Sequence, residues 1–357
     1  MPPLLRYLFR RIVAIPVTLL VITAVLYAFV MLTPPETRAL LYLPERMNPN
    51  LSDERYQNLV NQIIKRHHLN DPFPIQYIFW LRSLLTGQWG YSPSLNQPVL
   101  AAILQRTPAT LELTLYSLLL FIPLGMLSGT LAAQKRNQAT DLGFRLLAFI
   151  ATSLPSFILS FVLMAVFYVS LRWFAPERIT TGLQFNLVDT GFHFYTGLLT
   201  IDGVLNGRFD VVVDALRHLV MPVFTLILYH WATLGRITRA SVLVELARPY
   251  VIAARARGLA QSRVVWRHAL RNVLAPALTS TAFSASSLLG GVFVVEIIFR
   301  FNGVSYLIVQ ALSGIPDAPA ALGFAIYSVL VVLLLMLALD LVQAVVDPRV
   351  RDEVLET

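Results

Sequence analysis

The chain has 357 residues, of which 56% are hydrophobic and only 13% are charged, and its mean hydropathy is +0.66. This composition excludes an ordinary soluble globular protein, in which charged residues make up about 25%. The net charge of +8 is compatible with nucleic-acid binding, but basic cytoplasmic loops of a membrane protein account for it without nucleic acid. Because the chain has no cysteine, disulfides and thiolate metal sites are impossible.

Six uncharged stretches approach or exceed the roughly 20 residues that a helix needs to cross a bilayer. They cover residues 12–32, 113–133, 146–171, 218–235, 273–295 and 318–339. With their flanks, they predict spanning helices at about 9–32, 108–133, 146–171, 218–237, 273–297 and 318–345. The first is too long for the apolar part of a signal peptide and no Ala-x-Ala cleavage site follows it, so we expect an uncleaved helix. The expected class is an all-α polytopic membrane protein.

The basic residues predict the orientation, because cytoplasmic loops carry an excess of lysine and arginine. If the N-terminus is inside, the cytoplasmic segments hold more than half of the 28 basic residues. These are Arg6, Arg10 and Arg11, Lys135, Arg136 and Arg145, eight arginines between 236 and 271, and Arg349 and Arg351. We therefore expect both termini inside and the long loops 34–106 and 173–216 outside.

The two external loops have different compositions. In the first, a polar helix is expected at 53–68 and an aromatic helix at 73–85. Tyr77, Phe79 and Trp80 place the aromatic helix either at the membrane interface or in a packed loop. His67 and His68 are adjacent and so do not share a helix face, which favours a solvated loop over a metal pair. The second loop is rich in glycine, threonine and aromatic residues and predicts irregular structure with short helices.

The loop at 238–272 carries the most functional information. Pro249 suits the first position of a helix, Gly258 suits a left-handed residue just after its end, and Ser262 suits the cap of a second helix that runs to about Arg271. Small residues at Ala253, Ala254 and Gly258 recur at helical spacing and leave one face nearly bare. A bare face permits another protein to approach closely, so we interpret this loop as a docking element.

The same residues resemble a known family. Ala253-Ala254, Gly258, the run from Arg267 to Asn272, and Pro276 are similar to the coupling-loop ("EAA") signature of bacterial ABC importer permeases. The segment from Tyr250 to Leu259 resembles the oligopeptide/dipeptide/nickel branch. Ile252 stands where the general motif has glutamate, and Arg271 stands where many members have proline. Further similar strings begin at Pro108, Ser153, Leu216, Gly290 and Asp347.

The resemblance implies one six-span permease domain over residues 1–357, type I importer-like, in the bacterial inner membrane. It implies partners: two ATP-binding subunits, a second permease or a second copy, and an extracytoplasmic solute-binding protein. The contact with the ATPases would use Tyr250, Ala253, Ala254, Arg257, Gly258, His268 and Asn272, and the outer mouth of the pathway would use Gly290, Gly291 and Glu296. Peptides are the expected cargo, while a nickel chelate, glutathione or a sugar stays open. The chain would not be an enzyme and would bind no cofactor, since ATP and magnesium would belong to the partner subunits.

Energy supply and coupling distinguish the alternatives. Lys65 and Lys135 are each followed by arginine, so the chain has no phosphate-binding Walker A loop. Ionisable residues within the expected spans are few, and they include His230, Glu296 and Asp340. We expect local partners for His230 and Asp340, and for Glu296 either contact with water or contact with substrate. An ion-coupled transporter or channel without ATPases is the alternative, but it would need intramembrane acids. An intramembrane enzyme lacks a visible catalytic pair, and a structural membrane protein would not need the loop at 238–272.

Overall fold

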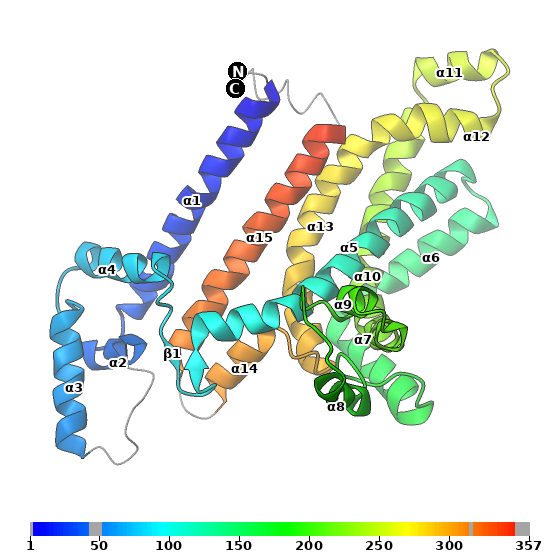
Figure 1. The fold of residues 1–357 in the computed structure, drawn as a ribbon. Coiled ribbons are helices and arrows are strands. Elements are labelled where there is room, and N and C mark those ends of the chain that lie inside the picture. The colour runs from blue at the N-terminus through cyan, green and yellow to red at the C-terminus, as the bar shows by residue number, and fades with distance from the viewer. Residues whose placement is uncertain (1–2, 43–51, 314–316, 347–357) are drawn as a thin grey trace. The chain divides into compact units, whose positions relative to one another are not determined.

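The computed structural model describes residues 3–42, 52–313 and 317–346, and nearly all of its regular structure is helical (Figure 1). Within the described residues, five helices are each long and apolar enough to cross a membrane. They are α1 (Pro3–Val30), α5 (Val99–Gln134), α10 (Phe209–Glu245), α13 (Leu270–Ile298) and α15 (Ala318–Val346). Five of the six expected spans are therefore single helices, and α10 is longer at both ends than the expected 218–237. The expected match from Asp347 to Arg351 lies outside the described residues.

The third expected span, 146–171, was predicted as one continuous helix, and this was wrong. Helix α6 (Ala139–Ser153) is followed by α7 (Ser156–Leu163) and the π-helical segment η2 (Met164–Ser170), with a bend of 98° between the two arms. Leu154 at the break is extended, with φ −96° and ψ 116°. The ring of Pro155 disfavours helical backbone at the residue before it, which explains the break. The count of spans is six only if this bent pair is one span.

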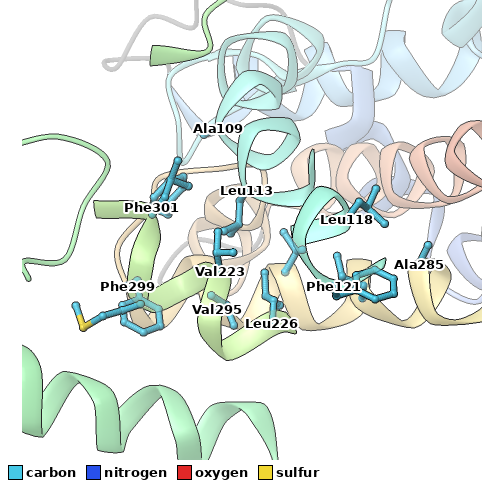
Figure 2. Close-up of a cluster of buried hydrophobic side chains, with 14 of the residues drawn as sticks. Ala109, Leu113, Leu118, Phe121, Val223, Leu226, Ala285, Val295, Phe299 and Phe301 are labelled. Atoms are coloured by element: carbon cyan, nitrogen blue, oxygen red, sulfur yellow. The ribbon is translucent and has the colours of Figure 1, made fainter. Parts of the chain in front are cut away.

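Contacts divide the chain into two compact units: the first holds residues 1–9, 108–302 and 334–357, and the second holds residues 10–107 and 303–333. In the first unit α10 packs on α13, α6, α7 and α9 (Leu199–Leu205). Figure 2 shows the core of this unit, where buried apolar side chains of α5, α10 and α13 meet. Those labelled there include Leu113, Phe121, Val223, Leu226, Ala285 and Val295.

Glycines bring α5 and α10 into close contact. A Cβ atom at Gly129 would lie 2.3 Å from the carbonyl oxygen of Gly235, and one at Gly235 would lie 2.8 Å from the ring of Phe144. Gly125 and Gly129 are spaced by one helical turn, the small-residue pattern that lets two membrane helices approach. Any larger side chain at Gly129 would separate α5 from α10.

The loop at 173–216 belongs to the first unit and contains α8 (Thr181–Asp189), α9 and the beginning of α10. The expected irregular loop with short helices is confirmed. Asp202 holds the turn before α9: its carboxylate accepts hydrogen bonds from the backbone nitrogens of Thr196 at 2.9 Å and Gly197 at 2.8 Å.

The second unit contains most of α1, the short α2 (Pro35–Ala39) and η1 (Leu40–Tyr42), α3 (Asp53–Arg66), α4 (Phe73–Leu85) and α14 (Ser305–Leu312). Strands β1 (Tyr91–Ser92) and β2 (Gln97–Pro98) form an antiparallel pair. The helix expected at 53–68 is confirmed, although it ends at Arg66, and the aromatic segment at 73–85 is a helix too. Helix α4 packs on α1, where the ring of Trp80 stacks on that of Tyr27 at 4.8 Å. This contact accords with a packed helix for Trp80.

The two adjacent histidines have different environments. His67 is half-buried and stacks on Tyr42 at 3.9 Å, so the expectation of a plain solvated position was wrong for it. Burial, with the charges of Arg66 and His68, lowers the pKa of His67. His68 is exposed, and its Nδ1 lies 2.7 Å from a carboxylate oxygen of Asp71. Across residues 3–42, 52–313 and 317–346 no group of three histidine, aspartate or glutamate side chains could hold a metal ion.

Candidate functional site

The loop after α10 begins with a helix whose two ends follow the sequence prediction. Helix α11 runs from Pro249 to Ala256, with Pro249 at its first position. Gly258 follows it with φ +79°, in the left-handed region. Its backbone nitrogen donates to the carbonyl of Arg255 at 2.9 Å, and that of Leu259 donates to the carbonyl of Ala254 at 3.3 Å. These two bonds form a Schellman motif, which satisfies carbonyls that the helix leaves free.

The second half of the loop differs from the prediction. Helix α12 (Gln261–Arg263) begins after Ala260, so Ser262 lies inside its first turn and is not the cap. The helix also does not end near Arg271. A π-helical segment, η3 (Val264–Ala269), joins α12 directly to α13. No glycine or proline occurs between Gln261 and Pro276, so nothing in the local sequence stops the helix. The loop therefore contains one separate helix, α11, and an extension of the fifth span.

Hydrogen bonds among three polar side chains join the two ends of the loop. The Tyr250 hydroxyl donates to Oε2 of Glu245 at 2.6 Å, and Nδ2 of Asn272 donates to the Tyr250 hydroxyl at 2.9 Å. Burial, together with the hydrogen bond to Glu245, raises the pKa of Tyr250, so its hydroxyl keeps the proton that it donates. The structure thus brings together Tyr250 and Asn272, two expected site residues 22 positions apart. Glu245, at the end of α10, was missed because its partners come after it in a different helix.

Apolar packing holds α11 against the extension. Val251, Ala254 and Val264 form a small buried cluster, and Leu246 and Leu259 pack against it. A second cluster places Val265 beside residues of three spanning helices: Ala133 of α5, Val242 of α10 and Val273 of α13. The loop is therefore an ordered part of the first unit.

The exposed surface of the loop is basic and partly apolar. Ala253, Arg255, Arg257 and Gly258 are exposed, and nothing lies within 4 Å of the Cβ position of Gly258. The expectation of one bare face with three small residues was wrong for Ala254, which is 8% exposed. The sequence has no acidic residue between Glu245 and Glu296. His268 is half-buried.

The expected outer-mouth residues lie in α13, and their environments differ. Gly290 has open space around it, whereas a Cβ atom at Gly291 would lie 3.3 Å from a methyl group of Leu226 in α10. Gly291 is thus a packing position between two spans. Glu296 is only 1% exposed, so the expectation of a carboxylate in water was wrong.

Two of the expected intramembrane ionisable residues are also buried. His230 is 6% exposed beside the rings of Phe121 and Tyr229. Its Nδ1 has no hydrogen-bond partner within the described residues, so the expected local partner is absent for that atom. Asp340 is 8% exposed.

Two buried acids that sequence reasoning did not single out join distant segments of the first unit. Asp141 of α6 accepts hydrogen bonds from Nε and Nη2 of Arg239 in α10, at 2.6 and 2.8 Å. Glu112 of α5 binds Arg178 and Thr200 of the loop at 173–216. The only signal in the sequence was an acid next to an uncharged stretch, which does not identify a partner.

The comparisons with known proteins agree with these features. The family model described as "binding-protein-dependent transport system inner membrane component" matches residues 121–352, and the model of its N-terminal region matches residues 4–114. The chain is similar to the dipeptide transport system permease protein of Alkalihalophilus pseudofirmus, with 28% identity over 98% of this chain and 100% of the relative.

Two other relatives are similar over most of their length. The di/tripeptide transport system permease protein of Pseudomonas aeruginosa is 30% identical over 98% of this chain and 100% of the relative. The oligopeptide transport system permease protein of Bacillus subtilis is 31% identical over 97% of this chain and 99% of the relative. The apolar helices, the ordered basic loop after α10 and the family matches lead to one conclusion: the chain belongs to the family of inner-membrane permease components of binding-protein-dependent ABC transport systems.

Proposed function

We propose that this chain is one of two permease subunits of an ATP-driven importer of peptides. The loop from Glu245 to Asn272 is the observation that carries the proposal, because it presents an ordered, basic surface that a transporter without partners would not need. The names of the relatives support peptides as cargo. A secreted binding protein would deliver the peptide and would determine most of the selectivity.

We infer that both termini and this loop are cytoplasmic and that the chain crosses the membrane six times, with α6 and the arm from α7 to η2 counted as one span. The distribution of basic residues supports this orientation. The loops at 34–106 and 173–216 are then outside, where a binding protein reaches them.

The continuous path from α12 through η3 into α13 supplies a mechanism. Two ATP-binding subunits would hold α11 and α12, and their closure on ATP would displace these helices. Because η3 runs into α13 without a break, and Val265 packs with α5 and α10, the displacement would move three spans together. Such rigid-body movement would alternate the pathway between inward- and outward-open states. ATP and magnesium would bind only to the partner subunits, as expected from the absence of a Walker A lysine.

Reconstitution with separate subunits tests the proposal. The purified chain alone should not hydrolyse ATP, whereas hydrolysis should appear with the ATP-binding subunits and rise when peptide-loaded binding protein is added. Single cysteines at Ala253 and Arg257, both exposed, should crosslink to the ATP-binding subunits. A cysteine at the buried Ala254 is the control and should crosslink far less. Peptide uptake that continues without the ATP-binding subunits, driven by a sodium or proton gradient, would overturn the proposal.

A further inference from the structure

A cavity of about 490 Å³ lies in the first unit, between the end of η2, the turn that follows it, and the early part of α10. None of the residues singled out as functional lines it. Its lining combines basic and aromatic side chains, including Tyr168, Arg172, Trp173, Thr180, Arg217 and His218. None of the residues that line this cavity is acidic.

His218 carries a polar atom that lacks a partner. The side chain is 3% exposed, and its Nδ1 lies 2.8 Å from the backbone carbonyl oxygen of Asp214. A carbonyl only accepts, so Nδ1 donates, and Nε2 is the ring nitrogen left for another group. This Nε2 is buried and has no hydrogen-bond partner within the described residues. When the ring is neutral with its proton on Nδ1, Nε2 only accepts and does not donate to an anion, so His218 contributes to the wall of the cavity.

Arg172 and Arg217 provide positive charge, and neither has a carboxylate partner among the residues that the structure describes. Arg217 uses Nε and Nη2 to donate to the carbonyl oxygen of Trp173, the Nε bond being 2.8 Å, and this leaves Nη1 for another acceptor. Arg172 is exposed and has φ +55°. Asp214, whose carboxylate lies 3.5 Å from Nδ1 of His218, accepts from the backbone nitrogen and the hydroxyl of Thr180 at 2.7 and 2.8 Å. Two guanidinium groups fit the oxygens of a phosphate.

Exposed apolar side chains continue from the cavity along both of its helical walls. On the side of η2, Val169 is 66% exposed, and on α10 Val220 is 46% exposed. Tyr168 and Trp173 stand at the rim, and such aromatic residues are enriched where a membrane meets water. A free phosphate or a peptide carboxylate has no apolar part that packs on these side chains. The acyl chains of a lipid would cover them.

We infer that this cavity binds the phosphate group of an anionic phospholipid, with the acyl chains along η2 and α10. The phosphate oxygens accept from Arg172 and from Nη1 of Arg217. With the proposed orientation, the lipid belongs to the outer leaflet. Basic pockets between membrane helices bind lipid head groups on the cytoplasmic side of membranes, and the charge-assisted hydrogen bonds that hold a phosphate are the same on either side. The inference does not depend on the cargo or on the ATP-binding subunits.

Photocrosslinking tests the site in the full-length chain in nanodiscs. The probe is a phosphatidylglycerol with a diazirine in one acyl chain, mixed into phosphatidylethanolamine. Mass spectrometry should find the adduct in peptides that contain Val169 or Val220. The double substitution of Arg172→Gln with Arg217→Gln should lower the adduct at least about tenfold, since it removes charge-assisted hydrogen bonds.

Arg300→Gln is the matched control, because Arg300 is also exposed and left-handed, with φ +52°, and does not line the cavity. It should leave the adduct unchanged. Equal adduct in the wild type and in the double variant would overturn the inference. Loss of adduct on adding millimolar inorganic phosphate would assign the site to a free anion, and loss on adding dipeptide would assign it to the cargo; both overturn it. A double variant that elutes as the wild type does in size exclusion shows that loss of adduct is not loss of folding.

Discussion

Glu112 of α5 and Arg178 of the loop at 173–216 form a partly buried ion pair, in which Nη2 of the arginine lies 2.6 Å from Oε2 of the carboxylate. The other oxygen of Glu112 accepts from the backbone nitrogen of Thr200 at 2.9 Å and from its hydroxyl at 2.8 Å. Glu112 is 1% exposed and Arg178 is 20% exposed at the side chain. The carboxylate of Glu112 thus holds two separate segments of the loop at 173–216 against helix α5.

Glu112→Ala should destabilise the first unit and release the external loop. Removing one partner of a buried pair leaves the other charge uncompensated, which costs about 3–5 kcal/mol. Limited proteolysis of the purified chain should show earlier cleavage between α8 and α10, and the unfolding temperature should fall. Asp210→Asn is the control, because Asp210 pairs with Arg208 at the surface. Unchanged proteolysis in Glu112→Ala would show that the pair does not hold the loop.

Gly258→Val should leave membrane insertion intact and weaken coupling to the ATP-binding subunits. Gly258 has φ +79°, a conformation that a β-branched residue adopts only with strain, so the end of α11 should change shape. The measurement is ATP hydrolysis by the reconstituted transporter with and without peptide-loaded binding protein. Gly258→Asn is the matched control, since asparagine tolerates the left-handed region.

Gly258→Val and Gly258→Asn together distinguish two reasons why glycine stands at this position. If only valine lowers the stimulation, the backbone conformation is what the site needs. Equal loss in both would mean that a partner contacts this position directly, since nothing within the described residues lies within 4 Å of its Cβ position. Full stimulation in Gly258→Val would remove Gly258 from the proposed contact.

Tyr250→Phe should loosen α11, because it removes the hydroxyl that joins Glu245 to Asn272. The net loss should be about 1 kcal/mol, as for a typical hydrogen bond. Hydrogen–deuterium exchange of residues 249–258 should be faster in the variant than in the wild type. Tyr195→Phe makes the same chemical change at an exposed tyrosine of the external loop and should not alter that exchange.

The same cluster predicts the pH dependence of α11. The pKa of Tyr250 in the folded chain is raised above its ordinary value near 10, so the neutral hydroxyl is the form that folding favours. The contribution of this hydroxyl to stability is therefore complete at pH values below the pKa of Tyr250 in the unfolded chain. It is lost as the pH rises through the pKa of Tyr250 in the folded chain. Exchange of residues 249–258 should show no step from the loss of this hydroxyl proton between pH 6 and about pH 9 in the wild type. A step in that range that is absent in Tyr250→Phe would contradict the raised pKa.

The orientation is testable because the chain has no native cysteine. Ala260 and Asn96 are both exposed, so a cysteine at either position is accessible from its own side of the membrane. In intact cells a membrane-impermeant thiol reagent should label the cysteine at Asn96 and not the one at Ala260. Permeabilised cells should show labelling of both. The reverse pattern in intact cells would invert the proposed topology.

Several features of this chain were predictable because they depend on local chemistry. Uncharged runs of about 20 residues indicated spanning helices, since burying a charge in the hydrocarbon core is unfavourable at any position along the run. The ends of α11 followed from Pro249 and Gly258, whose backbone preferences act within one turn. The motifs of the loop also indicated the family, which the family matches confirm.

Other features depended on residues far apart in the sequence. Ser262 has the chemistry of a cap, but the helix began at Gln261 and continued through η3, because packing of Val264 and Val265 favoured continuation. Glu112 looked like any acid beside a span, and its partners Arg178 and Thr200 lie 66 and 88 positions away.

Sequence alone determined the membrane class, the positions of most spans and the family, because each depends on composition or on motifs within a single segment. Tertiary structure alone decided which buried charges are paired, which small residues lie on the surface, and where the basic cavity beside His218 forms. These depend on which distant side chains meet when α5, α10 and α13 pack, and a linear sequence does not state such contacts.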